Sequence, residues 1–158
     1  MKSAWAATLA TLVLGASAAW GQSAVVVTNA WSRATPPGAQ TGAAYFTLTS
    51  PAGDKLVGVS TQVAKTAQVH EMTMDGTIMR MREVTGGLDL PPGKPVALQP
   101  GGSHVMLMGL AAPLKRGQTL RLHLTFEHAA PVDVEAPIAA IGATSSPMGG
   151  PGGPMHMP

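Results

Sequence analysis

The sequence predicts an all-β fold, a Greek-key sandwich or barrel of about 115 residues. Short runs of strand-like composition recur along the chain, and turn signals rich in Gly and Pro separate them about every 8–12 residues. No convincing helical period lies between them. With 158 residues, of which 45% are hydrophobic, the chain suits one domain with its own core.

Each expected strand alternates apolar and polar residues or is rich in β-branched ones, and each ends at a turn signal. Thr119 to Glu127 shows the alternation most clearly, with Leu122 and Leu124 inward and His123 outward. In chain order the expected strands are 24–31, 42–49, a weaker 55–63, 67–74, 77–84, 94–98, 103–108, 119–127 and 132–138.

The two strands around Asp75-Gly76 form a predicted hairpin, because Asp-Gly is a strong signal for a two-residue turn. A turn centred on this dipeptide places His70 opposite Met81 and Met72 opposite Met79. All four side chains then point to one face, while Glu71 and Arg80 pair on the other.

A second run, HVMLM at 104–108, repeats the combination of histidine and methionine. His104 and Met106 stand two residues apart and so share one face of a strand. Together with His70 and Met81 they predict a site of two imidazoles and two thioethers. Neutral, soft thioether sulfur favours Cu(I) over zinc and hard cations, so the expected cargo is Cu(I).

Other methionines and histidines have alternative interpretations. Met72, Met79 and Met108 are candidate accessory ligands, but methionine also serves as a flexible core filler. A β-sandwich interaction domain with methionine in its core, and no metal, is therefore a competing hypothesis. The cluster Met155, His156 and Met157 is a candidate tail site for copper or an incidental part of the tail.

Both ends of the chain differ from the middle. Lys2, an apolar run and several small residues indicate a signal peptide over 1–22, which predicts an exported, periplasmic protein. The copper-binding domain is expected over 23–138. From 139 to 158 the composition changes to Gly, Pro, Ser, Met and His, which predicts a flexible tail.

Composition also argues against several classes of function. Only 11% of residues are charged and no basic cluster occurs, so nucleic acid is not an expected partner. No second apolar segment predicts stable membrane insertion after signal cleavage. The chain lacks cysteine, which excludes disulfides and a blue-copper centre. Without a Ser-His-Asp spacing, a phosphate loop or paired carboxylates, we do not expect an enzyme.

At this point the residues resemble those of the periplasmic copper chaperone family PCuAC, formerly a domain of unknown function. The family motif is a His, ten residues, a Met, a longer interval and His-x-Met. Here ten residues separate His70 from Met81, and 22 separate Met81 from His104, one more than in the usual pattern. The similar stretches are NAWSRATPPGAQTGAAYFTL at 29–48, HEMTMDGTIMRM at 70–81, LPPGKPVALQPGGSHVMLMGL at 90–110 and LKRGQTLRLHLTF at 114–126.

The resemblance implies a cupredoxin-like fold that binds Cu(I) near its surface through His70, Met81, His104 and Met106. It also implies delivery of copper to the dinuclear centre in subunit II of cytochrome c oxidase, often alongside a Sco-type thioredoxin-like protein. Relatives with His/Met-rich extensions imply additional Cu(II) binding at the tail. Periplasmic copper storage or tolerance without a dedicated acceptor is the alternative function.

Overall fold

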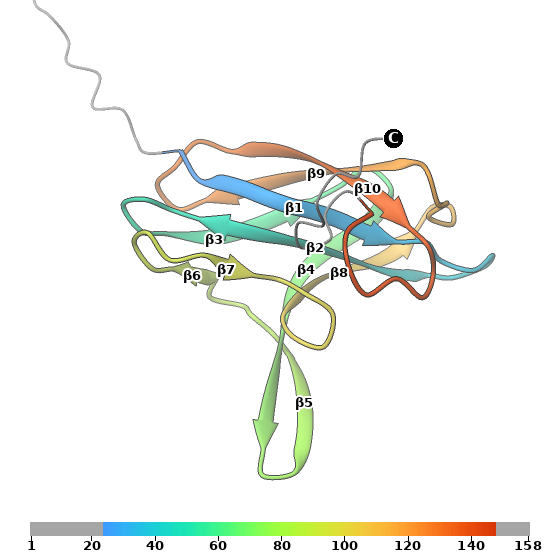
Figure 1. Ribbon diagram of the computed structural model, residues 1–158, viewed down its shortest axis with the longest axis horizontal. Coiled ribbons are helices and arrows are strands. Elements are labelled where there is room, and N and C mark those ends of the chain that lie inside the picture. The colour runs from blue at the N-terminus through green and yellow to red at the C-terminus, as the bar shows by residue number, and fades with distance from the viewer. Residues whose placement is uncertain (1–23, 148–158) are drawn as a thin grey trace, which may run out of the picture.

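A computed structural model describes residues 24–147, and the statements below concern this part of the chain. It contains ten β-strands and no helix, which confirms the predicted all-β fold (Figure 1). No helix long and apolar enough to cross a membrane therefore occurs within 24–147. The strands are β1 (Val26–Arg33), β2 (Thr41–Thr49), β3 (Asp54–Ser60), β4 (Ala64–Asp75), β5 (Ile78–Glu83), β6 (Leu88–Leu90), β7 (Val96–Ala97), β8 (His104–Leu110), β9 (Thr119–Phe126) and β10 (Val132–Ala139).

Seven of these strands close into a barrel in the order β4, β8, β2, β1, β10, β9 and β3. The ring closes where Val59 of β3 pairs with Ala67 of β4. Neighbouring strands are antiparallel except β1 and β10, which run parallel. The remaining strands lie outside the ring: β5 pairs with β4, β6 with β3 and β7 with β2.

Side chains alternate between the two faces of each strand, and this alternation determines which residues form the core. On β9 the even-numbered residues point inward as expected: Leu122 and Leu124 are at most 1% exposed, and exposed residues alternate with them. Val105 and Leu107 of β8 are fully buried in the same core. The barrel therefore offers β8 and its neighbours a rigid, apolar support.

Strand β6 was not expected from the sequence. Its three residues, Leu88–Leu90, lie between Gly86-Gly87 and Pro91-Pro92, a context typical of loops. Nevertheless Leu90 is only 2% exposed, and the segment pairs with the start of β3. Burial of Leu90 against the barrel, rather than local propensity, stabilises this strand.

The hairpin of β4 and β5 leaves the barrel (Figure 1). Residues of β4 up to His70 pair with β8, whereas those beyond it pair with β5 alone. The turn consists of Gly76 and Thr77, one residue later than predicted. Gly76 has a φ of 64° and Thr77 does not have a positive φ, as in a type II′ turn with glycine at its first central position.

This turn corrects the predicted register. His70 lies opposite Glu83, not Met81, and Glu71 lies opposite Arg82, not Arg80. Moving the turn by one residue changes the partner of each residue by two, as from Met81 to Glu83 for His70, so residues that were predicted to share a face still do. The predicted shared face of the hairpin therefore survives, although its cross-strand pairs are Met72 with Met81 and Met74 with Met79.

The two chain ends fall largely outside 24–147. The predicted signal peptide, 1–22, and residues 148–158 of the predicted tail are not described. The predicted domain contains all of the strands except the last residue of β10, Ala139. Beyond that strand, the guanidinium Nε of Arg33 donates a hydrogen bond of 2.6 Å to the carbonyl of Ala143, which places this part of the tail beside β1.

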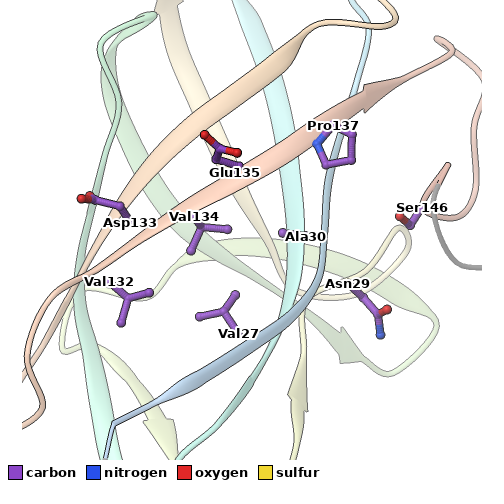
Figure 2. Close-up of a pocket in the computed structure, with 9 residues that line it drawn as sticks. All are labelled: Val27, Asn29, Ala30, Val132, Asp133, Val134, Glu135, Pro137 and Ser146. Atoms are coloured by element: carbon purple, nitrogen blue, oxygen red, sulfur yellow. The ribbon is translucent and has the colours of Figure 1, made fainter.

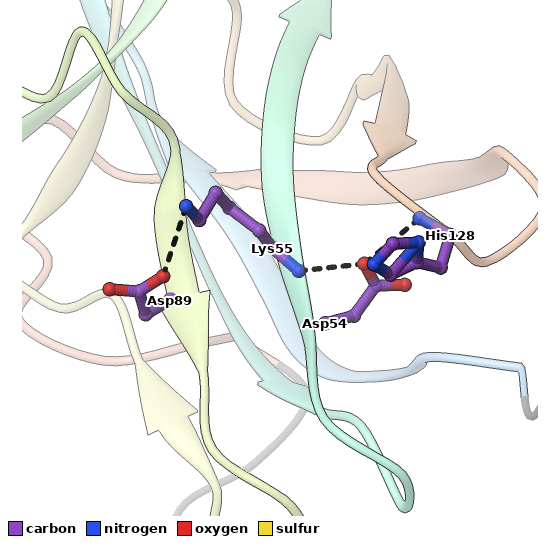
Figure 3. A network of polar contacts seen from close by, with 4 residues as sticks. All are labelled: Asp54, Lys55, Asp89 and His128. Atoms are coloured by element: carbon purple, nitrogen blue, oxygen red, sulfur yellow. Dashed lines mark hydrogen bonds and ion pairs between the residues drawn. The ribbon is translucent and has the colours of Figure 1, made fainter.

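Asp54 joins the start of β3 to the turn after β9 (Figure 3). The backbone N–H groups of Lys55, His128 and Ala129 donate to its carboxylate at 2.7, 3.0 and 2.7 Å. Burial acts to raise the pKa of Asp54, but these three hydrogen bonds and the charge of His128 together outweigh it and lower the pKa below the ordinary value of 3.8.

Candidate metal site

Two histidines meet where the hairpin leaves the barrel. His70 of β4 and His104 of β8 are directly opposed in the antiparallel ladder, and their ring centroids lie 5.9 Å apart. The preceding pair in the ladder, Val69 and Val105, points into the core and is at most 8% exposed. This buried pair fixes the two strands, so the imidazoles are held side by side on the other face.

The ring of His104 is oriented by the backbone. Its Nδ1 lies 3.1 Å from the carbonyl oxygen of Gly102. A carbonyl only accepts hydrogen bonds, so Nδ1 carries the hydrogen and Nε2 retains a free lone pair. Histidine ligands to metals commonly donate their second nitrogen in this way, which fixes the tautomer and the direction of the ring.

His70 contains an unsatisfied nitrogen. Its Nε2 lies 3.4 Å from Oε1 of Gln68, whereas its buried Nδ1 has no hydrogen-bond partner among the described residues. A buried polar atom without a partner costs about 1–3 kcal/mol. Coordination of a metal ion would supply the missing partner, so this lone pair suits a ligand better than a structural role.

The two predicted methionine ligands lie on either side of the histidine pair. Met106 is half-buried, shares the outer face with His104 two residues earlier, and is opposite Gln68. Met81 is 51% exposed and lies diagonally from His70, because its direct partner is Met72. The structure thus brings the histidines into direct opposition and places each methionine two residues along the strands from that pair, on the same face.

The accessory candidates divide into two groups. Met72 and Met79 belong to the hairpin face, on which Met74 also lies. Met108 is half-buried and lies four residues from His104, opposite Thr66 of β4 and Thr41 of β2. Met106 lies between it and the histidine pair, so Met108 lies outside the four-ligand site. The candidate tail residues Met155, His156 and Met157 lie outside the described part of the chain.

The chemistry of the described side chains favours a soft ion. Residues 24–147 contain no group of three or more His, Cys, Asp or Glu side chains arranged to hold a metal. Met81 and Met106 are the predicted ligands that share the face of His70 and His104, and thioether sulfur favours Cu(I). The exposed Met81 would leave such an ion accessible from solvent.

Trp31 and Tyr45, which the site hypothesis did not include, lie close to this face. Their ring centroids are 4.6 Å apart, and the guanidinium of Arg33 lies 5.5 Å from the Tyr45 ring. Burial raises the pKa of Tyr45, and the charge of Arg33 acts to lower it.

Tyr45 is adjacent to the histidine pair by register. Ala43 pairs with Met106, so continuing the register aligns Tyr45 with His104. The alternation of 42–49, which directs Tyr45 away from Phe46, was the available signal.

A cavity beside β1 and β10 is lined by different residues (Figure 2). It measures about 420 Å³ and lies where β1 and β10 separate after only two paired positions. Its lining includes three valines and the carboxylates Asp133 and Glu135, and none of the four predicted ligands contributes. It therefore does not belong to the histidine and methionine site.

Ser60, His123 and Asp133 lie side by side on the surface but do not form the hydrogen-bonded array of a catalytic triad. The ladder aligns Ser60 with His123 and His123 with Asp133, and Nδ1 of His123 lies 2.6 Å from the Asp133 carboxylate. However, no hydrogen bond joins Ser60 to His123 in the described chain, and the His123 and Asp133 side chains are 49% and 87% exposed. The pair is a solvated surface contact, as expected for a histidine on the polar face.

The chain matches a lipoprotein family and a relative that is named as a lipoprotein. The family described as "Putative lipoprotein LpqE-like" matches residues 25–138. A protein of Leifsonia xyli subsp. xyli, named "Putative lipoprotein Lxx21020", is 33% identical over 114 residues, which is 72% of this chain and 69% of that protein.

Solved structures of PCuAC domains share the fold. The apo PCuAC domain of PmoF2 matches with a TM-score of 0.64 and 25% identity over 77% of this chain and 94% of that one; a copper-bound form of that domain matches with a TM-score of 0.60. The Cu(I) form of DR1885 from Deinococcus radiodurans matches with a TM-score of 0.60 and 34% identity over 78% of this chain and 83% of that one. The barrel is thus cupredoxin-like, as predicted.

Proposed function

This chain belongs to the LpqE-like family, and from that premise we propose that it is a copper chaperone, not an enzyme, which binds Cu(I) through His70, His104, Met81 and Met106. Solved relatives of the same fold contain copper, in one case as Cu(I). The described residues offer imidazole and thioether ligands and no carboxylate cluster, a set that matches the preference of Cu(I).

The observation that carries this proposal is the opposed histidine pair. The rings are 5.9 Å apart between centroids, Nε2 of His104 is free, and Nδ1 of His70 is buried without a partner. Two nitrogen lone pairs thus remain available on neighbouring rings. The core beneath them holds the strands in place, so little ordering is required when an ion binds.

Release of the ion follows from the nature of the ligands. Thioethers are neutral and bind Cu(I) more weakly than thiolates, so an acceptor with cysteine or additional imidazole ligands would replace them one at a time. Met81 is the most exposed of the four ligands. We therefore expect exchange to begin there, while the half-buried histidines keep the ion until the acceptor has engaged it.

We propose that this transfer takes place outside the cytoplasm. The lipoprotein family and the lipoprotein-named relative support export, and the proposed route is the signal peptide over 1–22 into a periplasm. The proposed acceptor is the dinuclear copper centre in subunit II of cytochrome c oxidase, with a Sco-type thioredoxin-like protein as a second partner. Additional Cu(II) binding by Met155, His156 and Met157 is a further part of the proposal.

An anaerobic Cu(I) titration against a chromophoric chelator tests the site. In the full chain, Met81→Leu with Met106→Leu removes both sulfurs and should weaken the tightest site by at least about tenfold. Met108→Leu is the matched control, because Met108 lies on the same face of β8 as Met106 and should leave that affinity unchanged. An unaltered affinity in the double variant would exclude these sulfurs as ligands.

Transfer is tested separately. Mixing the Cu(I)-loaded chain with the apo copper domain of oxidase subunit II should move one copper ion to the acceptor. Retention of copper by the chain, with its affinity otherwise as expected, would instead favour storage or tolerance. This comparison distinguishes the two functions that the sequence left open.

A further inference from the structure

The hairpin of β4 and β5 projects from the barrel (Figure 1). Four methionines share one face of this hairpin. Met72 is directly opposite Met81, and Met74 is directly opposite Met79. The two pairs are two residues apart on each strand, so all four side chains point to the same side. Met74, Met79 and Met81 are 63%, 53% and 51% exposed.

The distances implied by this register allow shared coordination. Directly opposed residues have Cβ atoms about 4.5–5.5 Å apart, and diagonal neighbours are about 7–8 Å apart. Methionine has three rotatable side-chain bonds and places its sulfur far from the backbone. Three or four sulfurs can therefore converge on one ion above the hairpin without a change of the backbone.

The surroundings favour a soft ion over a charged ligand or a hard cation. The nearby carboxylate of Asp75 is engaged by Arg80 at 3.1 Å, and these two residues are on the opposite face from the methionines. Glu83 is the acidic residue on the methionine face. It lies opposite His70 at the barrel end of the hairpin, two positions along the face from the pair of Met74 and Met79. Thioethers are neutral and soft, so the distal methionines favour Cu(I) over a divalent hard cation. Exposed apolar side chains on a two-stranded hairpin contribute little to the core. Packing therefore does not explain why methionines gather on this face.

We propose that the hairpin face formed by Met72, Met74, Met79 and Met81 is a second Cu(I) site, distinct from the histidine pair. Met81 lies between the two sites: it faces Met72 within the hairpin and is diagonal to His70. The hairpin site is the more exposed of the two. Its role in capture or hand-over of copper rests on the proposed function, whereas its ability to bind Cu(I) does not.

The experiment is an anaerobic Cu(I) titration of the full chain labelled with ¹³C at the methionine methyl groups. We expect the methyl signals of Met74 and Met79 to shift in a separate, later step than that of Met106. The variant Met74→Leu with Met79→Leu should bind one equivalent of Cu(I) fewer than the unmodified chain. Met108→Leu should bind the same number, and every variant keeps the tail, so its contribution cancels.

Two results would overturn the second site. One is an unchanged stoichiometry in the Met74 and Met79 variant, with methyl signals of Met72, Met81 and Met106 showing that the variant is folded. The other is a loss of the Met74 and Met79 shifts in a His70→Ala, His104→Ala variant, which would make the hairpin part of a single site. Leucine is similar in size to methionine and both positions are exposed, so we expect the first variant to fold normally.

The histidine variant also separates the two proposals. If it loses the tightest equivalent but keeps the Met74 and Met79 shifts, both sites exist. If it binds copper as tightly as the unmodified chain while the hairpin signals shift, the proposed function at the histidine pair fails and the hairpin site stands alone.

Discussion

Asp54 shows how one carboxylate stabilises two loops. Its oxygens accept hydrogen bonds from three backbone N–H groups, those of Lys55, His128 and Ala129, and so tie the start of β3 to the turn after β9. Hydrogen bonds to a charged acceptor are stronger than those between neutral groups. The pKa of Asp54 is lowered because these bonds, together with the charge of His128, outweigh the opposing effect of burial.

Asp54→Asn should lower the free energy of unfolding at pH 7 by about 1–3 kcal/mol, because the amide offers one acceptor oxygen and turns its NH₂ toward a backbone donor. Asp54 has a lower pKa in the folded state than in the unfolded state. Its stabilisation is therefore complete above the unfolded value, near 3.8, and is lost as the pH falls through the folded value. Denaturant unfolding at pH 7 and in acid measures both effects.

Asp89→Asn provides the control for this prediction. Asp89 forms a salt bridge of 3.5 Å with Lys55, and its side chain is 83% exposed. An exposed ion pair contributes about 0–1 kcal/mol, so the variant should unfold almost as the unmodified chain does. A difference between Asp54→Asn and the unmodified chain that persisted unchanged in strong acid would contradict the role assigned to the carboxylate.

At the scale of elements, the β4–β5 hairpin depends on its turn. Beyond His70 it is a two-stranded ribbon, and such ribbons are marginally stable by themselves. Gly76 has a φ of 64°, and a Cβ placed there would meet nothing within 4 Å. The cost of a side chain at this position would therefore come from the backbone alone.

Gly76→Ala should destabilise the hairpin by about 1–2 kcal/mol, since an L-residue disfavours the left-handed region. Backbone amides of the distal hairpin should then exchange with solvent roughly 5–30-fold faster, while the barrel amides stay protected. Gly86→Ala is the control, because Gly86 does not have a positive φ and has open space around it. Equal exchange rates in the two variants would show that the turn does not limit the hairpin.

This hairpin also shows what the sequence could and could not specify. The Asp75-Gly76 signal located the turn within one residue, but Gly76 occupies the first central position rather than the second. Both turns satisfy the local preference of glycine. Alternate residues kept the face predicted for them, so the methionine face was predictable. The cross-strand partner of each methionine was not, because it depends on the exact position of the turn.

At the scale of the molecule, the barrel brings together residues that are distant in sequence. The period-two pattern of β9 was sufficient to predict its buried residues, such as Leu122 and Leu124. The direct opposition of His70 and His104, in contrast, depends on the pairing of β4 with β8, which no local pattern encodes. The sequence indicated which residues share a face; tertiary pairing determined which of them meet.

The same distinction explains the parts of the fold that were not predicted. Strand β6 is three residues long, and its stability comes from burial of Leu90 and pairing with β3. The parallel contact of β1 with β10 joins the first and last strands at only two positions. Such contacts depend on the closed ring as a whole and have no signal within a short window of sequence.

X-ray absorption spectroscopy of the full chain, loaded anaerobically with less than one equivalent of Cu(I), is the most direct test of the proposed copper site. Two nitrogen and two sulfur neighbours are expected around copper, and the nitrogen contribution should disappear in the His70→Ala, His104→Ala variant. A spectrum with sulfur neighbours alone, or with nitrogen and oxygen alone, in the unmodified chain would contradict binding at the histidine and methionine site.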